Sequence, residues 1–549
     1  MVPALYYSAE SYSTKGSKLM GRQAAGEAFL RALLRAFPNE PVHALLHSPK
    51  DAALIDKELA GFGHTAGIHK HHLSSLEAMT ASMLYLPSPG IDEIAWHRLK
   101  MGDRSFSLCG VTHTTATHRV METIANLPLA PIRPWDALIC TSRSVRNTVQ
   151  RIIEQQFDYL RWKLGATRLE LPQLPVIPLG VHCDDYQFSK NQQQKARKLL
   201  GVADNDIVLL FVGRLSFHAK AHPHPMLAAL QRVVEKGVGY RKLHLVQCGW
   251  YANQAIEDAF NETQQILAPS VVHHYLDGRE AENRQTAWAS ADIFISLSDN
   301  IQETFGLTPI EAMAAGIPSV VSDWDGYKDT IDHGVSGFRV KTIMPAAGGE
   351  SENIARRYNL GEDTYDMYCG QTCQYIGVDV QQTADAVYQL VTDKSLRKTM
   401  GENANKRAQR IFSWDIVMDK YIELWRQLEH LRHSHSDSFG VNPIKQSPSR
   451  MDPFDLFDDY PSVIANDHGE FLLTSPLNEE DYQRIVSLAT FRYAKRVIPS
   501  WQQVKLVQTS MGSKKQSFED ISSQCKAALE TSTLSETLCW LVKVGAVSI

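Results

Sequence analysis

Short apolar runs alternate with longer stretches of helical periodicity through the first third of the chain. Apolar runs of this length, bounded by turn-forming residues, are typical of strands buried on both faces of a parallel sheet. The stretches between them fit the helices that connect parallel strands, so the pattern predicts a doubly wound α/β domain. The predicted strands are residues 4–8, 42–47, 83–87, 106–111, 137–140 and 176–178.

One predicted helix, residues 149–164, carries a regular apolar stripe. Packing against the core is the favoured use of such a stripe, and a role facing a membrane or an acceptor stays open. The apolar positions of the stripe are 149, 152, 153, 157, 160 and 164.

A second series of apolar runs has the same character and predicts a second domain of the same class. We therefore expect two Rossmann-like domains, residues 1–185 and 186–432, that face each other across a cleft. The predicted strands of the second domain are residues 207–212, 243–247, 271–275, 293–297 and 319–321. Its predicted C-terminal helices are residues 380–391, 396–412 and 414–431.

Three segments do not follow this alternation. Residues 345–377 lack clear periodicity, so we expect an insertion that forms a surface loop or a subdomain. Residues 433–450 are rich in Ser, His, Pro and Arg, which is typical of a linker. The remaining residues, 451–549, contain two helical patterns (479–497 and 518–529) and predict a small, mainly helical appendage of unknown role.

Composition narrows the class of protein. The formal net charge is −5 over 549 residues, so the chain offers no overall attraction for nucleic acid. Its eight cysteines are scattered, which predicts reduced thiols and a cytoplasmic protein. We expect neither a signal peptide nor a transmembrane segment, and peripheral contact with the inner face of a membrane stays open.

The most informative motif is a pair of glutamates, Glu303 and Glu311, on either side of a glycine turn. It follows a predicted strand, and in open α/β sheets ligands bind beyond the carboxyl ends of strands. The sequence predicts a helix with Thr308 as its N-cap, Pro309 in its first turn and Glu311 at the capping-box position. A polar helix entrance of this kind fits phosphates and sugar hydroxyls, although Glu311 could serve only as a helix cap.

Two cations lie six positions apart in the loop after the first strand of the second domain. Arg214 and Lys220 could converge on one diphosphate and stabilise its departure without a metal ion. The alternative is that both are solvated side chains at a domain surface. We find no Asp-x-Asp motif in the candidate cleft, which agrees with chemistry that needs no metal.

Together these segments resemble the E-x7-E signature and the Gly-Arg-Leu…Lys element of family-4-type retaining glycosyltransferases. The resemblance covers residues 1–430 and implies the GT-B fold, in which two Rossmann-like domains flank the cleft. It implies transfer of a sugar from a nucleoside diphosphate donor with retention of anomeric configuration, and it implies no metal and no cofactor. No residue identifies itself as a covalent nucleophile.

The resemblance also implies roles for individual residues. The implied catalytic residues are Arg214, Lys220, Glu303 and His113, with Glu303 holding hydroxyls of the donor sugar. The implied donor-binding residues are Glu311 at the ribose, Gly278 and Arg279 near the base, and Gly16, Phe305, Gly306 and Leu307 near the phosphates. Lys18 and Arg22 belong to the family's first glycine-rich loop, which lies against the phosphates and the acceptor.

Two of these assignments have local alternatives. A lone histidine after a strand, such as His113, is as often structural as functional, and His118 completes no set of metal ligands. The spacing of Gly16, Lys18 and Gly21 imitates a P-loop, but Arg22 stands where that motif requires lysine, so we do not expect an ATPase.

Other functions stay open at this point. Paired acids also serve glycoside hydrolases, but eight helical residues span about 12 Å, whereas hydrolase carboxyls lie roughly 5 to 9.5 Å apart. A non-catalytic sugar-nucleotide-binding or scaffold protein, or a sugar-nucleotide epimerase, could share this fold. The favoured ligands are a UDP- or GDP-sugar donor and a glycan, lipid-linked or small-molecule acceptor, as in polysaccharide biosynthesis, with no nucleic acid.

Overall fold

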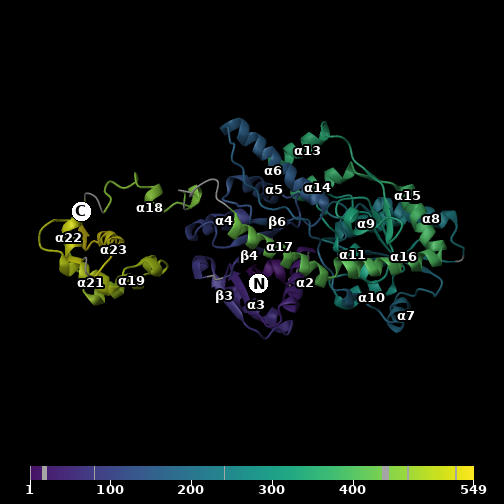
Figure 1. The fold of residues 1–549 in the computed structure, drawn as a ribbon, viewed down its shortest axis with the longest axis horizontal. Coiled ribbons are helices and arrows are strands. Elements are labelled where there is room, and N and C mark those ends of the chain that lie inside the picture. Colours follow the sequence, from purple (N-terminus) through teal and green to yellow (C-terminus); the bar gives the residue numbers. More distant parts are fainter. Residues whose placement is uncertain are drawn as a thin grey trace. The chain divides into compact units, whose positions relative to one another are not determined.

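The structure is a computed structural model that describes residues 2–14, 21–78, 81–239, 241–435, 444, 446–465, 469–525 and 528–549. The chain divides into two compact units, residues 1–446 and 447–549 (Figure 1). Each unit is described by itself. The residue boundaries of the two Rossmann-like domains and of the linker stay predictions.

A parallel six-stranded sheet in the order β3-β2-β1-β4-β5-β6 organises the N-terminal part of the larger unit. Its strands are β1 (Ala4–Tyr7), β2 (Val42–Leu46), β3 (Ile68–His72), β4 (Met83–Leu86), β5 (Ser107–Val111) and β6 (Ala137–Ile139). Its helices are α1 (Ala9–Tyr12), α2 (Gly21–Ala36), α3 (Pro49–Gly61), α4 (Ile91–Arg98), α5 (His118–Asn126) and α6 (Arg143–Leu164), with short 3-10 turns η1 (Leu73–Ala78), η2 (Leu99–Met101) and η3 (Leu127–Leu129). Buried apolar clusters cover both faces of the sheet.

A second parallel six-stranded sheet follows, in the order β12-β11-β10-β7-β8-β9. Its strands are β7 (Ile207–Val212), β8 (Leu243–Gly249), β9 (Val272–Asp277), β10 (Ile293–Ser296), β11 (Ser319–Ser322) and β12 (Gly337–Val340). Its helices are η4 (Cys183–Tyr186), α7 (Lys190–Leu199), α8 (Pro223–Lys236), α9 (Gln254–Leu267), α10 (Ala281–Ser290), α11 (Leu307–Ala314), α12 (Tyr327–Thr330), α15 (Val380–Thr392) and α16 (Lys394–Arg407). The predicted fold of two doubly wound α/β domains is confirmed.

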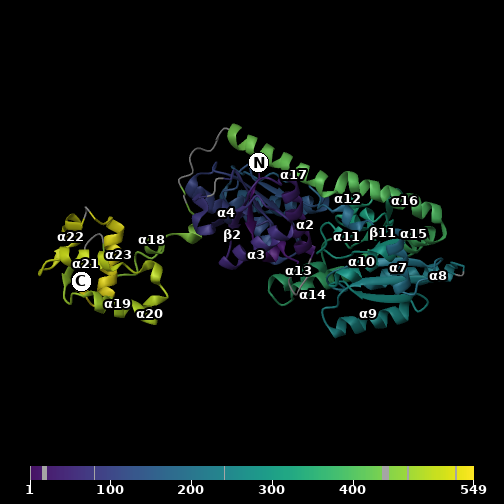
Figure 2. The same cartoon turned by 90° about the horizontal axis from the view of Figure 1, so that it is seen from below.

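The chain crosses between the two sheets twice. On the return it passes through a π-helical turn, η5 (Ala408–Phe412), into α17 (Trp414–Ser434), which packs its apolar face on the first sheet (Figure 2). The two crossings are hydrogen-bonded to each other, because Val181 N–H donates to the Phe412 carbonyl (2.7 Å) and Trp414 N–H donates to the Val181 carbonyl (3.1 Å). These bonds place a hinge-like junction beside the cleft.

The insertion is helical, with α13 (Glu350–Asn359) and α14 (Tyr365–Gln374) between two short paired strands, β13 (Thr342–Ile343) and β14 (Gly377–Val378). Its residues alternate too irregularly for sequence periodicity to reveal these ten-residue helices.

Several sequence predictions need correction. Residues 176–178 form no strand, and only an isolated bridge joins Val176 to Cys140. Two strands of the six-stranded sheets were not predicted: the sequence of β3 is too polar for a buried strand, and β12 contains a glycine and an arginine. The apolar stripe of α6 packs in the core as far as Leu160, but Leu164 at its end is 70% exposed.

The smaller unit has a three-stranded antiparallel sheet in the order β16-β15-β17 and its own buried core. The helix predicted at 479–497 is broken into α19, α20 and a 3-10 turn, and of the helix predicted at 518–529 the structure describes α22 as far as Cys525. The strands are β15 (Glu470–Leu473), β16 (Gln516–Ser517) and β17 (Val547–Ser548). The helices are η6 (Pro448–Arg450), α18 (Pro453–Leu456), α19 (Glu479–Ser487), α20 (Ala489–Arg492), η7 (Lys495–Val497), α21 (Trp501–Ser510), α22 (Phe518–Cys525) and α23 (Thr531–Lys543).

All eight cysteines are free thiols. Within the described ranges, no helix is both long enough and apolar enough to cross a membrane.

Candidate functional site

A cleft of about 1050 Å³ lies between the two sheets of the larger unit. The loops that line it follow the carboxyl ends of strands in both domains, which is where ligands bind in open α/β sheets. From the first domain come Arg22 and residues 112–114. From the second domain come residues 211–214, 248–250 and 302–308, among others.

Lys220 and Glu303 form an ion pair in this cleft, with 3.2 Å between Nζ and Oε2. The Lys220 side chain is 36% exposed and that of Glu303 is 13% exposed, so the pair faces the cavity but is largely shielded from solvent. Arg214 lies on the same wall and donates hydrogen bonds from Nη2 to Gln302 Oε1 (3.3 Å) and to the Ala219 carbonyl (3.4 Å). Arg214 is thus bonded to the residues that directly precede Lys220 and Glu303, so two cations and one anion lie on the same wall.

A buried polar network brings these two segments together. Asn300 Nδ2 donates to the His218 carbonyl (2.9 Å), and the His222 N–H donates to Asp299 Oδ1 (3.2 Å). Asp299 and Asn300 are almost completely buried. The loop after β7 is thus fastened to the loop after β10, which fixes where Lys220 and Glu303 can lie.

The entrance of α11 opens onto the same cavity. The helix starts at Leu307, and its N-cap is Gly306, whose φ of 82° lies in the left-handed region that glycine tolerates best. The predicted N-cap at Thr308 is wrong, because this glycine turn lets the helix begin two residues earlier. Phe305 is buried just before the turn, and the first N–H groups of the helix, which lack partners within it, face a cavity suited to anions.

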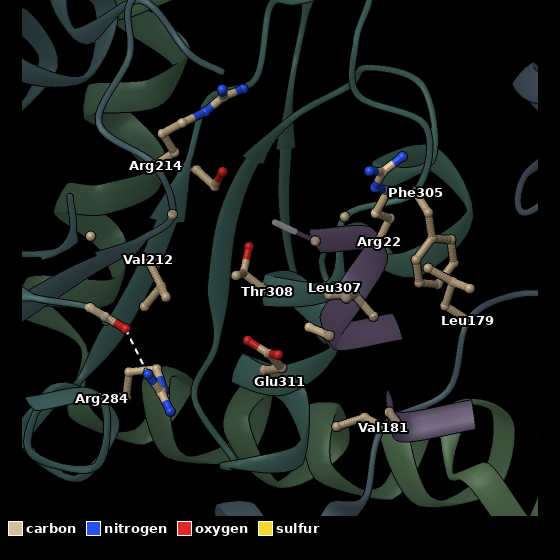
Figure 3. Close-up of a pocket in the computed structure, with 18 of the residues that line it drawn as sticks. Arg22, Leu179, Val181, Val212, Arg214, Arg284, Phe305, Leu307, Thr308 and Glu311 are labelled. Atoms are coloured by element: carbon tan, nitrogen blue, oxygen red, sulfur yellow. Dashed lines mark hydrogen bonds between the residues drawn. The ribbon is translucent and has the colours of Figure 1, made fainter. Parts of the chain in front are cut away.

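Glu311 lies one turn further into α11 and also reaches the cavity (Figure 3). Its carboxylate accepts a hydrogen bond from the Tyr186 hydroxyl rather than from the backbone of its own helix entrance, so the capping-box prediction is wrong. Burial raises the pKa of Glu311 to about 7, although the nearby Arg284 acts in the opposite direction.

The loop after β9 forms the end of the cleft near Glu311. The Gly278 N–H donates to the Gly249 carbonyl (2.8 Å), so the two loops lie against each other. Arg279 lines the cleft but is paired with Asp277 (2.6 Å) and is half exposed. Arg284 Nη1 donates to the carbonyls of Gly278 (2.8 Å) and Arg279 (3.0 Å), which fixes the conformation of this loop.

The first domain contributes His113 and Arg22. Burial lowers the pKa of His113 to about 4, so its ring is neutral near pH 7. His113 Nε2 donates to the Pro87 carbonyl (3.2 Å), and Thr304 of the second domain donates a hydrogen bond to the backbone carbonyl of His113. Arg22 lines the cleft at the start of α2 and is paired with Glu10.

Gly16 and Lys18 lie outside the described residues. All the other predicted site residues lie around one cleft: Arg22, His113, Arg214, Lys220, Gly278, Arg279, Glu303, Phe305, Gly306, Leu307 and Glu311. The chemical role of each of these residues stays a prediction.

Residues 192–347 match the family described as glycosyl transferases group 1. The chain carries a glycosyl transferases group 1 domain. The match begins in α7 and ends just after β13. It therefore includes the loop that carries Arg214 and Lys220 (residues 213–222, the cation loop), the glutamate pair and all six strands of the second sheet.

Two relatives match the chain over stretches longer than the group 1 domain. The chain is 27% identical over 298 residues to a D-inositol 3-phosphate glycosyltransferase of Corynebacterium urealyticum, covering 54% of this chain and 60% of the relative. It is 32% identical over 214 residues to the protein of the same name in Geodermatophilus obscurus, covering 38% of this chain and 46% of the relative. The chain thus spans less than two thirds of these relatives.

A solved structure shares the fold of the larger unit. The structure of Anabaena Alr3699/HepE in complex with UDP and glucose superposes with a TM-score of 0.50, at 16% identity. The similarity covers 78% of this chain and all of that one. The GT-B arrangement implied by the sequence resemblance is therefore supported over both domains.

Several residues that line or support the cleft were not predicted. Asp299 and Asn300 directly follow an apolar strand, and that position could have marked them. Tyr186 and Arg284 carried no such signal, because their contacts with the site depend on tertiary structure. Among the residues that the structure describes, no group of three or more His, Cys, Asp or Glu side chains could hold a metal ion.

Proposed function

We propose that this chain is a retaining glycosyltransferase that moves a sugar from a nucleoside diphosphate donor without the help of a metal ion. The observation that carries the proposal is the convergence of Arg214, the Lys220–Glu303 pair and the entrance of α11 on one wall of the cleft. A diphosphate needs cations and N–H donors, and a sugar needs a carboxylate, and all three are within this wall.

Arg214 and Lys220 bind the diphosphate and stabilise the negative charge that develops as it leaves. A cation about 4 Å from an anion contributes roughly 4 kcal/mol at an effective dielectric constant of 20. The N–H groups of Gly306 and Leu307 add dipolar stabilisation at the helix entrance. Because charge grows on the leaving group in the transition state, these interactions raise the rate rather than only the affinity.

Glu303 accepts hydrogen bonds from hydroxyls of the donor sugar, and its ion pair with Lys220 orients its carboxylate. Glu311 accepts hydrogen bonds from the ribose, and the loop of Gly278 and Arg279 borders the base. Neutral His113, with Nε2–H bonded to Pro87, keeps Nδ1 as an acceptor for a hydroxyl of the donor sugar.

The reaction proceeds on one face of the sugar. The bond between the anomeric carbon and the phosphate oxygen breaks, and the diphosphate leaves with the electron pair. An acceptor hydroxyl forms the new bond on the same face, and its proton passes to the departing phosphate oxygen. This step needs no covalent nucleophile, which agrees with the pairing of Glu303 to Lys220.

The comparisons support a UDP-sugar as the first donor to test, since the structure of Anabaena Alr3699/HepE holds UDP and glucose. A GDP-sugar is the second. A glycan, a lipid-linked sugar or a small polyol are the candidate acceptors, and Arg22, near the start of α2, lies on their side of the cleft.

The test is a transfer assay with UDP- and GDP-sugars in EDTA, using candidate acceptors and water. We expect release of the nucleoside diphosphate and a product whose anomeric configuration, determined by NMR, equals that of the donor. Inversion of the configuration would contradict the retaining step. Binding of a sugar nucleotide without turnover would favour a scaffold protein, and a changed sugar without transfer would favour an epimerase.

A further inference from the structure

The insertion between β13 and β14 is a folded helical hairpin. Arg357 holds its turn, with Nε donating to Asp363 Oδ2 (3.0 Å) and Nη2 donating to Gln371 Oε1 (2.6 Å). Ile354 and Cys369 are buried between the hairpin and its surroundings. The paired ends, Thr342 to Val378 and Ile343 to Gly377, fix the two points at which the hairpin leaves the second domain.

One side of the hairpin packs on the cation loop. Gly370 of α14 lies so close to His218 that a Cβ added at this glycine would be 2.9 Å from the Cβ of His218. The Cys373 thiol donates to the Phe217 carbonyl (3.5 Å), and Asp366 lies 3.8 Å from His218 Nε2. His218 lies two residues from Lys220, so the position of α14 bears directly on the loop that carries this lysine.

The other side of the hairpin reaches the first domain. The His118 N–H, at the start of α5, donates to the Tyr358 hydroxyl (2.9 Å), and the two rings meet edge to face at 5.9 Å. The Tyr365 hydroxyl lies 3.5 Å from Thr114 Oγ1. Thr114 lines the cleft directly after His113. Tyr358 in turn stacks on Tyr368 (4.3 Å), which fixes its ring.

We propose that the hairpin α13–α14 is a clasp, which joins the two domains at the cleft and positions the Arg214–Lys220 loop for the leaving diphosphate. The proposal rests on the proposed function. Other contacts also cross between the domains, from Ser142 to Asp325 (3.2 Å) and from Arg143 to Asp329 (2.6 Å). Those contacts join the start of α6 to α12 and to the loop before it, whereas the clasp connects the His113 loop with the cation loop through one helical hairpin.

The contacts of the clasp suit reversible closure. They consist of two tyrosine hydroxyls and one ring pair near the surface, so each is weak and can break without unfolding either domain. The positioning residues are therefore Tyr358 and Tyr365, which touch the first domain, and Gly370, which permits the close approach to His218.

The first test compares donor turnover by wild type, Tyr358→Phe, Tyr365→Phe and the double variant. A matched control is Tyr375→Phe, since Tyr375 ends the same hairpin with an exposed side chain. We expect kcat of the double variant to fall about fivefold to tenfold, with the donor KM within about twofold and the melting temperature unchanged. A double variant with the kcat of wild type, or a loss that follows only the melting temperature, would overturn the proposal.

The second test displaces the cation loop by a substitution in α14 of the clasp. Gly370→Ala should favour the helix, yet its new Cβ must displace His218. Because the gain in helix propensity and the cost of this displacement oppose each other, we expect a lower kcat with little change in the melting temperature. Wild-type kcat in this variant would show that α14 does not position the loop.

The third test does not depend on activity. Amide hydrogen exchange of the peptide covering residues 112–120 should become faster, about fivefold at His118, in Tyr358→Phe but not in Tyr375→Phe. Equal exchange in all three proteins would overturn the clasp. If the wild type transfers no sugar at all, the proposed function fails, and this exchange measurement still decides whether the clasp exists.

Discussion

The two walls of the cleft are built in different ways. The donor wall, formed by residues 213–222 and 302–311, concentrates its charges: Arg214, Lys220 and Glu303 meet there, and a buried network fastens them. The acceptor wall, formed by Arg22 and residues 112–114, holds a neutral buried histidine and one partly exposed arginine. Under the proposed function, rate enhancement resides in the donor wall, whereas the acceptor wall and the clasp decide what is held and when the cleft is closed.

The largest effect is expected from the cations of the donor wall. Lys220→Ala or Arg214→Ala should lower turnover by about two to three orders of magnitude, because each removes charge stabilisation from the leaving diphosphate. The measurement is kcat under saturating donor. Lys236→Ala is the control, since it removes a lysine of the same domain that pairs with Asp385 at the surface. Near-normal transfer by both cation variants would refute the assignment of the rate to this wall.

The second-largest effect is expected from a change of backbone shape in the donor wall, at the entrance of α11. Gly306→Ala forces a left-handed alanine and places its Cβ 2.1 Å from the Tyr327 ring. Gly316→Ala has a similar φ, 72°, but its nearest neighbour lies at 3.8 Å. The left-handed strain costs about 1–2 kcal/mol at either site. Only at Gly306 does the added Cβ also clash with the Tyr327 ring, so only Gly306→Ala should lose nucleotide binding as well. Equal binding losses, measured by calorimetry, would show that the α11 entrance is not part of the site.

A substitution of Glu311 tests its role in nucleotide binding and its role in folding by two separate measurements. Glu311→Gln should weaken nucleotide binding about tenfold, because a charged hydrogen bond to the ribose becomes a neutral one. Burial raises the pKa of Glu311 from 4.5 to about 7, so the folded chain holds this proton more tightly than the unfolded chain. Its contribution to stability is complete below pH 4.5 and is lost as the pH rises through about 7.

Glutamine carries no such proton, so the melting temperature of Glu311→Gln relative to wild type should increase between pH 5 and pH 8. Thermal unfolding at both values measures this difference. An equal loss of melting temperature at both values would mean that Glu311 serves only the packing of α11.

The smallest effect is expected on the acceptor wall. Arg22→Ala should leave hydrolysis of the donor within about twofold of wild type and raise the acceptor KM about fivefold. Arg22 is 43% exposed and paired with Glu10, so it has little influence on the buried diphosphate. A fall in donor hydrolysis as large as that of Lys220→Ala would erase the distinction between the walls.

The same distinction explains what the sequence could predict. Arg214, Lys220 and Glu303 lie in the loops that follow apolar strands, so local pattern placed them at the carboxyl ends of a parallel sheet. The Thr308 cap failed because a propensity rule ignored the turn that Gly306 permits. The strand β3 and the helices of the clasp were missed because one is polar and the others lack periodicity. Tyr186, Asn300 and Tyr358 act through partners more than 80 positions away, which no local pattern contains.

The most direct test of the account is a thermal-shift titration with UDP, GDP, ADP and their sugar conjugates in EDTA, on wild type and on the double variant Arg214→Ala/Lys220→Ala. We predict that one nucleoside diphosphate raises the melting temperature of the wild type by several degrees, and that the double variant shows little or no rise. No shift in a well-folded wild type with any of these nucleotides would contradict a donor site in this cleft.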